Sequence, residues 1–268
     1  MTKHCWRAAI VSTIVSAFLG SGTAYAGDPE TGQWKFSTGV DYSSGDYGED
    51  QDTDIVYVPV TVRYLKDPWL FKQTVPWIHI KGPGGVIGGG TDGSVVVGGG
   101  SQAERRTESG LGHVVASVGY TLPGLMQQGT FVEFTGKVKF GTADEDKELG
   151  TGENDYTIQV DVAKRFGEFT PFGTLGYRFT GESDQFDLDD VFFVSVGGGY
   201  KFTAKTSAGL IYDYREASSR TSDDPSEIVG YVSHKLSDLW ALTAYAATGF
   251  SDGSPDANIG VQVTYTVP

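Results

Sequence analysis

Charged side chains recur at alternate positions in several segments of the chain, and this spacing is the feature most able to do chemistry. In residues 130–140, Glu133, Lys137 and Lys139 alternate with apolar residues such as Phe134. A β-strand turns successive side chains to opposite faces, so such a segment has one charged face and one apolar face. Charges gathered on one face can bind ions or line a water-filled path.

Catalytic chemistry finds little support. The mature chain contains His79, His113 and His234, and none belongs to an H-E-x-x-H motif or an i, i+4 metal pair. No G-x-S-x-G nucleophile motif is present. The only cysteine, Cys5, lies in the leader described below, so the mature chain has no thiol for a disulfide or a metal site. We expect neither an enzyme nor a bound cofactor or metal.

The elements that must position the charges are strands. About twelve segments with period-two alternation follow one another from Gly32 to the C-terminus, and the connections alternate between short turns and long polar loops. A soluble periplasmic sandwich would also alternate, but many of these segments exceed the usual strand length. The pattern predicts an all-β fold, a closed antiparallel up-and-down transmembrane barrel of about twelve strands. Short turns and both termini would face the periplasm, and the long loops would be extracellular.

Aromatic residues collect near the ends of the expected strands, as the two membrane interfaces of a barrel require. The candidates for these aromatic girdles are Trp34, Tyr64, Trp69, Trp77, Tyr120, Phe166, Tyr177, Phe202, Trp240, Phe250 and Tyr265.

If the apolar faces contact lipid, the charged faces line the lumen. The candidate lumen-lining residues are Arg63, Lys72, Glu133, Lys137, Lys139, Asp161, Arg165, Arg178, Lys201, Asp213 and Arg215. Two interpretations stay open at this point. The charges can guide a permeant solute, with the basic excess favouring anions, or they can form a mixed network that fills and stiffens the interior.

The N-terminus reads as a Sec signal peptide covering residues 1–26. Lys3 and Arg7 precede a short apolar run, and Ala24-Tyr25-Ala26 forms the cleavage site. The apolar run is too short for a spanning helix. Removal of the leader leaves residues 27–268 as the barrel, with 18 of the 20 basic side chains against 34 acidic ones. Such an acidic chain argues against nucleic-acid binding.

Two kinds of loop stand out. Residues 81–110 form a glycine-rich external loop containing Val86-Ile87 and Val95-Val96-Val97, which could constrict the barrel mouth, form a short external hairpin or remain flexible. Acidic residues gather in the loops at 46–54, 144–155 and 184–190. Solvated loops are the usual explanation of such clusters, and we expect no metal site there.

Several segments resemble the phenol-degradation MetA-pathway family of bacterial outer-membrane proteins, whose members are often called transporters. They are VPVTVRY at 58–64, VPWI at 75–78, SGLG at 109–112, VGY at 118–120 and the stretch 136–181. The similarity spans most of the mature chain, but its motifs are turns and strand ends and say little about chemistry. This chain departs from the family pattern at Phe140-Gly141-Thr142, which lacks the usual proline, and at Pro268, which replaces an aromatic last residue.

The resemblance implies passage of small solutes through the outer membrane. We therefore expect a monomeric channel or transporter for small solutes, including aromatic or anionic ones, that needs no energy input. Its other partners would be outer-membrane lipid, lipopolysaccharide and, during insertion, the barrel-assembly machinery. The alternative is a surface structural or adhesion barrel with a closed lumen and acidic ligand-binding loops.

Overall fold

The computed structural model describes residues 32–47, 50–83, 86–87, 96–97, 105–183, 187–220 and 222–267. The expected signal peptide lies outside the described residues. Within the described residues, no helix is both long and apolar enough to cross a membrane.

The chain folds almost entirely into antiparallel strands. The strands are β1 (Gln33–Gly45), β2 (Thr53–Lys66), β3 (Trp69–Gly82), β4 (Val86–Ile87), β5 (Val96–Val97), β6 (Arg106–Leu111), β7 (Val115–Thr121), β8 (Thr130–Lys139), β9 (Asp155–Lys164), β10 (Phe169–Phe179), β11 (Val191–Lys201), β12 (Thr206–Arg215), β13 (Ser226–Lys235), β14 (Trp240–Gly249) and β15 (Ala257–Thr266). One short 3-10 helix, η1 (Leu125–Gln128), lies between β7 and β8.

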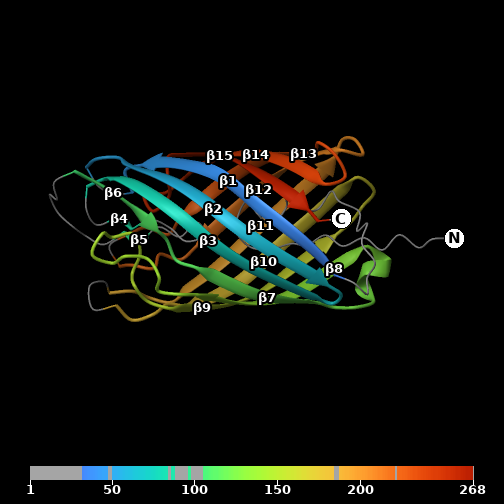
Figure 1. Cartoon of the computed structure of the whole chain (residues 1–268), viewed down its shortest axis with the longest axis horizontal. Coiled ribbons are helices and arrows are strands. Elements are labelled where there is room, and N and C mark those ends of the chain that lie inside the picture. Colours follow the sequence, from blue (N-terminus) through green and yellow to red (C-terminus); the bar gives the residue numbers. More distant parts are fainter. Residues whose placement is uncertain are drawn as a thin grey trace.

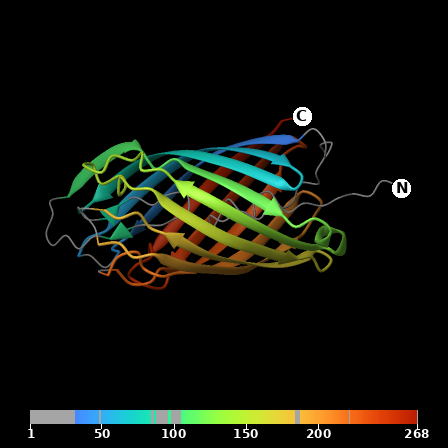
Figure 2. The same cartoon turned by 90° about the horizontal axis from the view of Figure 1, so that it is seen from below.

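The main sheet closes on itself into a barrel (Figures 1 and 2). Strand β1 pairs with β2 on one side and with β15 on the other, and strands β7 to β14 each pair with the next strand in the chain. Strands β6 and β7 both pair with β3 and together fill a single position in the wall. The barrel therefore has twelve strand positions, and the predicted fold and strand number are confirmed.

The turns and loops separate to opposite ends of the barrel, as predicted. The connections β2–β3, β7–β8, β9–β10, β11–β12 and β13–β14 are short and lie at one end. The same end holds the start of β1 and the end of β15, where the Val267 N–H donates to the Trp34 carbonyl oxygen over 2.9 Å. Long loops join the strands at the other end. By the usual arrangement of outer-membrane barrels, the short-turn end is periplasmic and the long-loop end is extracellular.

The glycine-rich connection is shorter than predicted. Strand β3 continues to Gly82 and β6 begins at Arg106, so both ends of the expected 81–110 loop belong to the barrel wall. Strands β4 and β5 pair as a small separate sheet, with Val86 opposite Val97. A short hairpin was one of the structures expected here, and the other residues of the connection lie largely outside the described part of the chain.

Side chains alternate between the two faces of the wall. Val60 and Ile158 point outward and are 54% and 59% exposed, whereas Thr61, Thr157 and Gln159 beside them in the chain are buried. Apolar surface of this kind is stable against hydrocarbon, and the closed sheet leaves few unpaired backbone groups at membrane depth. The faces therefore carry the polarity that the sequence predicted.

Candidate functional site

One row of inward-facing residues, in which each residue is the cross-strand partner of the next, is basic. Seven neighbouring strands each contribute one residue to this row. From β1 to β10 the members of this basic row are Lys35, Arg63, Lys72, Ser117, Lys137, Thr157 and Arg178. All seven are buried, so the row faces the enclosed interior and not the lipid.

The position of the basic row along the barrel axis changes from strand to strand. Lys35 lies near the periplasmic start of β1, and Arg178 lies near the extracellular end of β10. This change follows from the tilt of barrel strands, which makes a row of cross-strand partners rise as it passes around the barrel. The five cations thus form a series on the inner wall that runs from near the periplasmic end to near the extracellular end of the barrel. Lys137 is held partly by Phe193, since its Nζ atom lies 5.8 Å from the centre of that ring.

A second row of the interior is acidic and follows a parallel course. From β7 to β13 the members of this acidic row are Thr121, Glu133, Asp161, Thr174, Ser195, Asp213 and Glu227. On β8 the two rows are four residues apart, at Glu133 and Lys137, which is about 13 Å along the strand. The two rows therefore begin at separate positions on the wall, although the charges of Lys137 and Lys72 act on the Asp161 carboxylate.

Hydroxyl groups of the acidic row bind its carboxylates. Thr121 Oγ1 donates to Glu133 Oε2 over 2.9 Å, and Thr174 Oγ1 donates to Asp161 Oδ1 over 2.6 Å. Gln159 Nε2 adds a 2.6 Å hydrogen bond to the other Asp161 oxygen. Buried carboxylates need such donors because they have left water. The acidic row is therefore fixed to the wall by its own neighbours.

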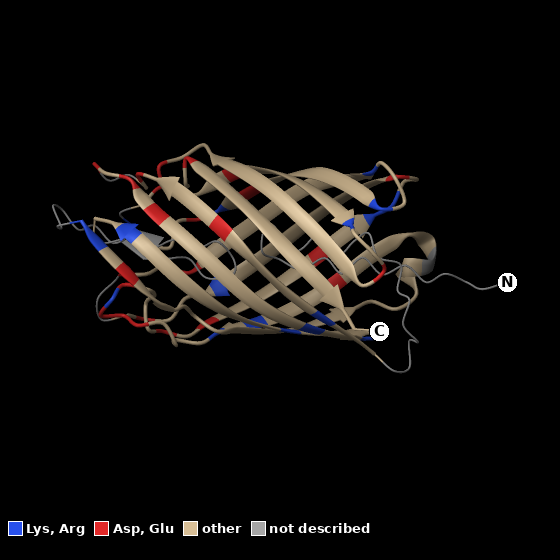
Figure 3. Ribbon diagram, turned by 45° about the horizontal axis from the view of Figure 1, so that its top comes forward, with Lys and Arg blue, Asp and Glu red and all other residues tan. Residues whose placement is uncertain are grey.

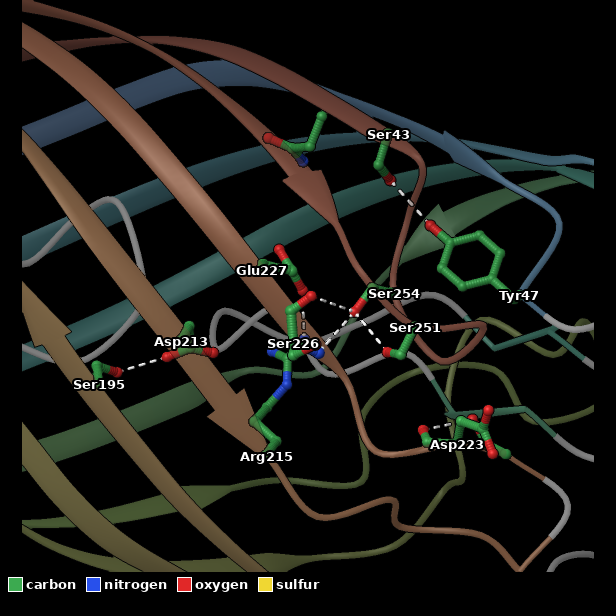
Figure 4. A network of polar contacts seen from close by, with 12 residues as sticks. Ser43, Tyr47, Ser195, Asp213, Arg215, Asp223, Ser226, Glu227, Ser251 and Ser254 are labelled. Atoms are coloured by element: carbon green, nitrogen blue, oxygen red, sulfur yellow. Dashed lines mark hydrogen bonds and ion pairs between the residues drawn. The ribbon is translucent and has the colours of Figure 1, made fainter.

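The upper end of the acidic row forms the network of Figure 4. Ser195 Oγ donates to Asp213 Oδ1 over 2.5 Å, and the Arg215 guanidinium donates to Glu227 Oε1 over 2.7 Å. Both members of the Arg215–Glu227 pair are only 9% exposed at the side chain. A buried ion pair of this kind depends on both partners, since either charge alone would be strongly unfavourable there.

Other predicted lumen residues lie nearer the ends. Lys139 is half-buried and forms a 2.7 Å ion pair with Asp155 at the extracellular end. Lys201 is half-buried at the last residue of β11, near the periplasmic end. Arg165 follows the last residue of β9 and is exposed in the β9–β10 turn, so it lies at the periplasmic rim and not along the inner wall. Strand periodicity alone could not locate the end of β9.

The sequence interpretation missed Lys35, which begins the basic row. The alternation of exposed Trp34 and Phe36 with buried Lys35 and Ser37 was the signal that could have found it. It also missed Asp41, whose carboxylate accepts hydrogen bonds from Tyr245 and Asn258 at the inner face of β1.

The interior also contains apolar residues, which the sequence interpretation did not anticipate. One cluster on the inner wall is formed by Phe131, Ala163, Phe172, Ile211, Val229 and Tyr231. Glycines on adjacent strands make room for such rings: a Cβ at Gly197 would collide with Phe172, and a Cβ at Gly260 would collide with Tyr245.

A second apolar cluster lies at the extracellular mouth. It is formed by Tyr47 and the inward residues Ile55, Ile78 and Ile80, together with Ala143 and Leu149 of the β8–β9 loop. Leu149 is 0% exposed, so the loop folds inward against the wall. Burial raises the pKa of the Tyr47 phenol well above its ordinary value.

His113 joins the same loop to the wall between β6 and β7. Its Nδ1 atom lies 2.9 Å from the Phe140 carbonyl oxygen, and its Nε2 atom accepts a hydrogen bond from the Thr151 N–H over 3.2 Å. These two contacts require the neutral ring with the proton on Nδ1. His113 is thus a structural residue of the mouth. Across the described residues, no group of three or more His, Cys, Asp or Glu could hold a metal ion.

Aromatic side chains surround the barrel near both ends. At the periplasmic end, Trp34 packs against Tyr64 with ring centres 4.6 Å apart, and Trp69 packs against Tyr120 at 4.8 Å. The predicted girdle residues at this end are Trp34, Tyr64, Trp69, Tyr120, Phe166, Phe202, Trp240 and Tyr265, and those nearer the extracellular end are Trp77, Tyr177 and Phe250. Acidic side chains gather towards the long-loop end (Figure 3).

Solved structures with this architecture are outer-membrane channels and porins. An outer-membrane channel of the COG4313 group from Pseudomonas putida F1 superposes with a TM-score of 0.68 at 12% identity, covering 90% of this chain and 98% of that one. The NanC porin gives 0.56 at 9% identity and the KdgM porin in complex with oligogalacturonate gives 0.54 at 9%, each covering 86% of this chain and 98% of the other. The fold is therefore that of an outer-membrane barrel, and the protein resides in the outer membrane.

The sequence comparisons agree with the fold. No curated protein sequence matches the chain. The model of the family described as "Putative MetA-pathway of phenol degradation" matches residues 49–267, which is most of the chain. The chain belongs to this family.

Proposed function

We propose that the protein is a passive channel that carries small solutes through the outer membrane and prefers anions. The observation that carries this proposal is the basic row, which brings five cations from the periplasmic end of β1 to the extracellular end of β10 on a single inner track. A solute on this track meets a cation or a hydroxyl at every strand. Because the track is part of a static wall, movement along it needs no energy input.

The separation of the two charge signs supports a channel over a merely filled interior. A lumen that only needed filling would be satisfied by cations and carboxylates placed opposite each other, as Arg215 and Glu227 are. The basic row places five cations, together with Ser117 and Thr157, on one track of the wall. Like-charged neighbours repel each other, so such a row has an electrostatic cost that attraction of an anion would offset.

The apolar inner cluster extends the proposed range of solutes. Phe131, Phe172 and Tyr231 give the lower wall an aromatic surface directly beside the acidic row. Flat rings stack favourably on such side chains. Small aromatic solutes are therefore included in the proposed class.

A closed surface barrel is the second candidate, and the extracellular mouth favours it. Tyr47, Ile78 and Leu149 are at most 1% exposed and pack together just where a solute would enter. In this case the acidic loops around the mouth would do the binding, and the interior would only support the wall.

Single-channel recording in planar bilayers distinguishes the two candidates. If the protein is a channel, the refolded protein should give steady conductance steps in KCl. The current should need no driving force other than the applied voltage. Leu149→Ala, which trims the mouth cluster, should raise the conductance of a channel. Silence of both proteins, with heat-modifiable gel mobility showing that each is folded, would reject the channel and leave the surface barrel.

A further inference from the structure

We infer that inward glycines on one side of the barrel set the width of the lumen, and with it the size of the solutes that pass. They do so by letting aromatic side chains lie flat against the wall. The inference rests on the channel function proposed above and adds a size limit to it.

Every inward aromatic residue on strands β10 to β15 is the cross-strand partner of a glycine. The alternation that places Ser195 inside also turns these aromatic residues inward. The four pairs are Phe172 with Gly197, Phe193 with Gly176, Tyr231 with Gly209 and Tyr245 with Gly260. Outside these strands, the inward Phe131 has Ala163 as its partner instead. The pairing of rings with glycines therefore belongs to one side of the barrel.

The rings lie directly over the backbones of these glycines. A Cβ atom on any of the four would lie less than 3.0 Å from the partner ring, which is closer than Cβ atoms approach other groups in proteins. A larger residue at these positions would have to displace the ring. Because the wall lies behind the ring, the displacement would carry it towards the lumen.

Tyr231 shows how far one ring extends along the wall. It lies on β13, and a Cβ atom on Gly209 of β12 would be 2.6 Å from its hydroxyl oxygen. A Cβ atom on Gly199 of β11 would be 2.8 Å from the same oxygen. Gly199 and Gly209 are themselves cross-strand partners. The Tyr231 side chain therefore lies across two neighbouring strands instead of pointing towards the barrel axis, and it is 5% exposed.

Glycine is an unfavourable residue for a strand, because it loses much conformational freedom and has no side chain to pack. A ring that covers a glycine restores some of this packing, which would be a purely structural role. The role inferred here has a different consequence. A side chain at Gly209 would narrow the lumen without changing any charge.

The conductance and size selectivity of single channels test this inference. Gly209→Val should displace Tyr231 and lower the KCl conductance about twofold, because flow through a narrow lumen depends on its open cross-section. The gluconate-to-chloride permeability ratio should fall, since gluconate is the larger anion. The chloride-to-potassium ratio should keep its wild-type value, because the field along the lumen is unchanged.

Removal of the ring gives the opposite result and a rescue. Tyr231→Ala should raise the conductance and the gluconate-to-chloride ratio above the wild type. The double variant Gly209→Val, Tyr231→Ala should recover at least the wild-type conductance, because the ring that would be displaced is gone. Gly136→Val is the matched control, since Gly136 is exposed on the outer face of β8 and a Cβ atom there meets nothing within 4 Å.

Two results would overturn the inference while leaving the channel intact. One is a double variant that conducts as poorly as Gly209→Val, and the other is equal conductance in Gly209→Val and Gly136→Val. If Gly209→Val does not fold, Tyr231→Ala still decides, because wild-type conductance in that variant would also overturn the inference. Absence of any KCl current from the folded wild type would instead reject the channel function itself.

Discussion

The basic row and the acidic row have the same architecture and opposite chemistry. Each runs through seven neighbouring strands and combines charged side chains with hydroxyls. In the acidic row, the hydroxyls of Thr121, Thr174 and Ser195 donate to the adjacent carboxylates. A hydroxyl can donate to a carboxylate but cannot donate to a cation that has only donors of its own. In the acidic row the hydroxyls therefore bind the carboxylates of the same row, whereas Ser117 and Thr157 of the basic row can donate to an anion.

Because of this difference, substitutions in the two rows should have different effects. Changes in the acidic row should lower stability, because buried donors lose their acceptors. Changes in the basic row should alter ion selectivity, because the field along the track changes.

The largest effect on stability is expected at the ion pair between Arg215 and Glu227, where charges of opposite sign are in contact. Arg215→Met leaves the Glu227 carboxylate buried without its guanidinium partner and should lower the free energy of unfolding by about 3 kcal/mol. Urea unfolding in lipid vesicles, followed by tryptophan fluorescence, measures the change. Arg220→Met is the control, since Arg220 pairs with Asp187 and Asp189 on the surface and should contribute less than about 1 kcal/mol. Equal losses in both variants would contradict the assignment of a buried pair.

The acidic row itself comes next. Asp161→Leu removes the acceptor of the Thr174 hydroxyl and the Gln159 amide and should cost about 2 kcal/mol of unfolding free energy. Asp161→Asn keeps an acceptor oxygen and should cost less. Both variants should keep an anion-selective current. A cation-selective current in either would contradict the assignment of ion selectivity to the basic row.

Removal of one cation of the basic row should change selectivity. Arg63→Gln takes one buried cation from the track and should lower the chloride-to-potassium permeability ratio about fivefold, which corresponds to about 1 kcal/mol. The reversal potential in a KCl gradient measures this ratio. A variant that unfolds more easily but keeps the wild-type ratio would place Arg63 among the structural charges.

The smallest effect is expected at the extracellular mouth, which lies outside both rows. Burial raises the pKa of Tyr47, so this phenol keeps its proton in the folded protein when the unfolded chain begins to ionise near pH 10. Stability contributed by the neutral phenol is therefore complete below pH 10 and is lost as the pH rises further, by about 0.8 kcal/mol at pH 10.5. Tyr47→Phe should remove this part of the alkaline loss in urea titrations. An identical pH profile for the variant would show that the phenol is not buried in solution.

The fold was predictable because its signal is local. Alternation such as exposed Ile158 beside buried Thr157 and Gln159 fixes the two faces of a strand without knowledge of its neighbours. The lengths of the connections then separate the two ends of the barrel. Both features survive in the structure.

The rows were not predictable because they depend on register. Lys72 and Arg63 are partners only because β2 and β3 pair in one particular alignment, and a shift of two residues would keep both inside while breaking the row. The division of one wall position between β6 and β7, with His113 between them, likewise has no periodic signal. The inward apolar residues such as Phe131 were not among the expected lumen-lining residues, all of which are charged.

The most direct test of the account is the reversal potential of single channels in a KCl gradient for the wild type and for the combined variant Lys72→Gln, Lys137→Gln and Arg178→Gln. We expect anion selectivity in the wild type and loss or reversal of that selectivity in the combined variant, with both proteins folded. A wild type that prefers cations, or a combined variant with unchanged selectivity, would contradict the claim that the basic row is the path of the solute.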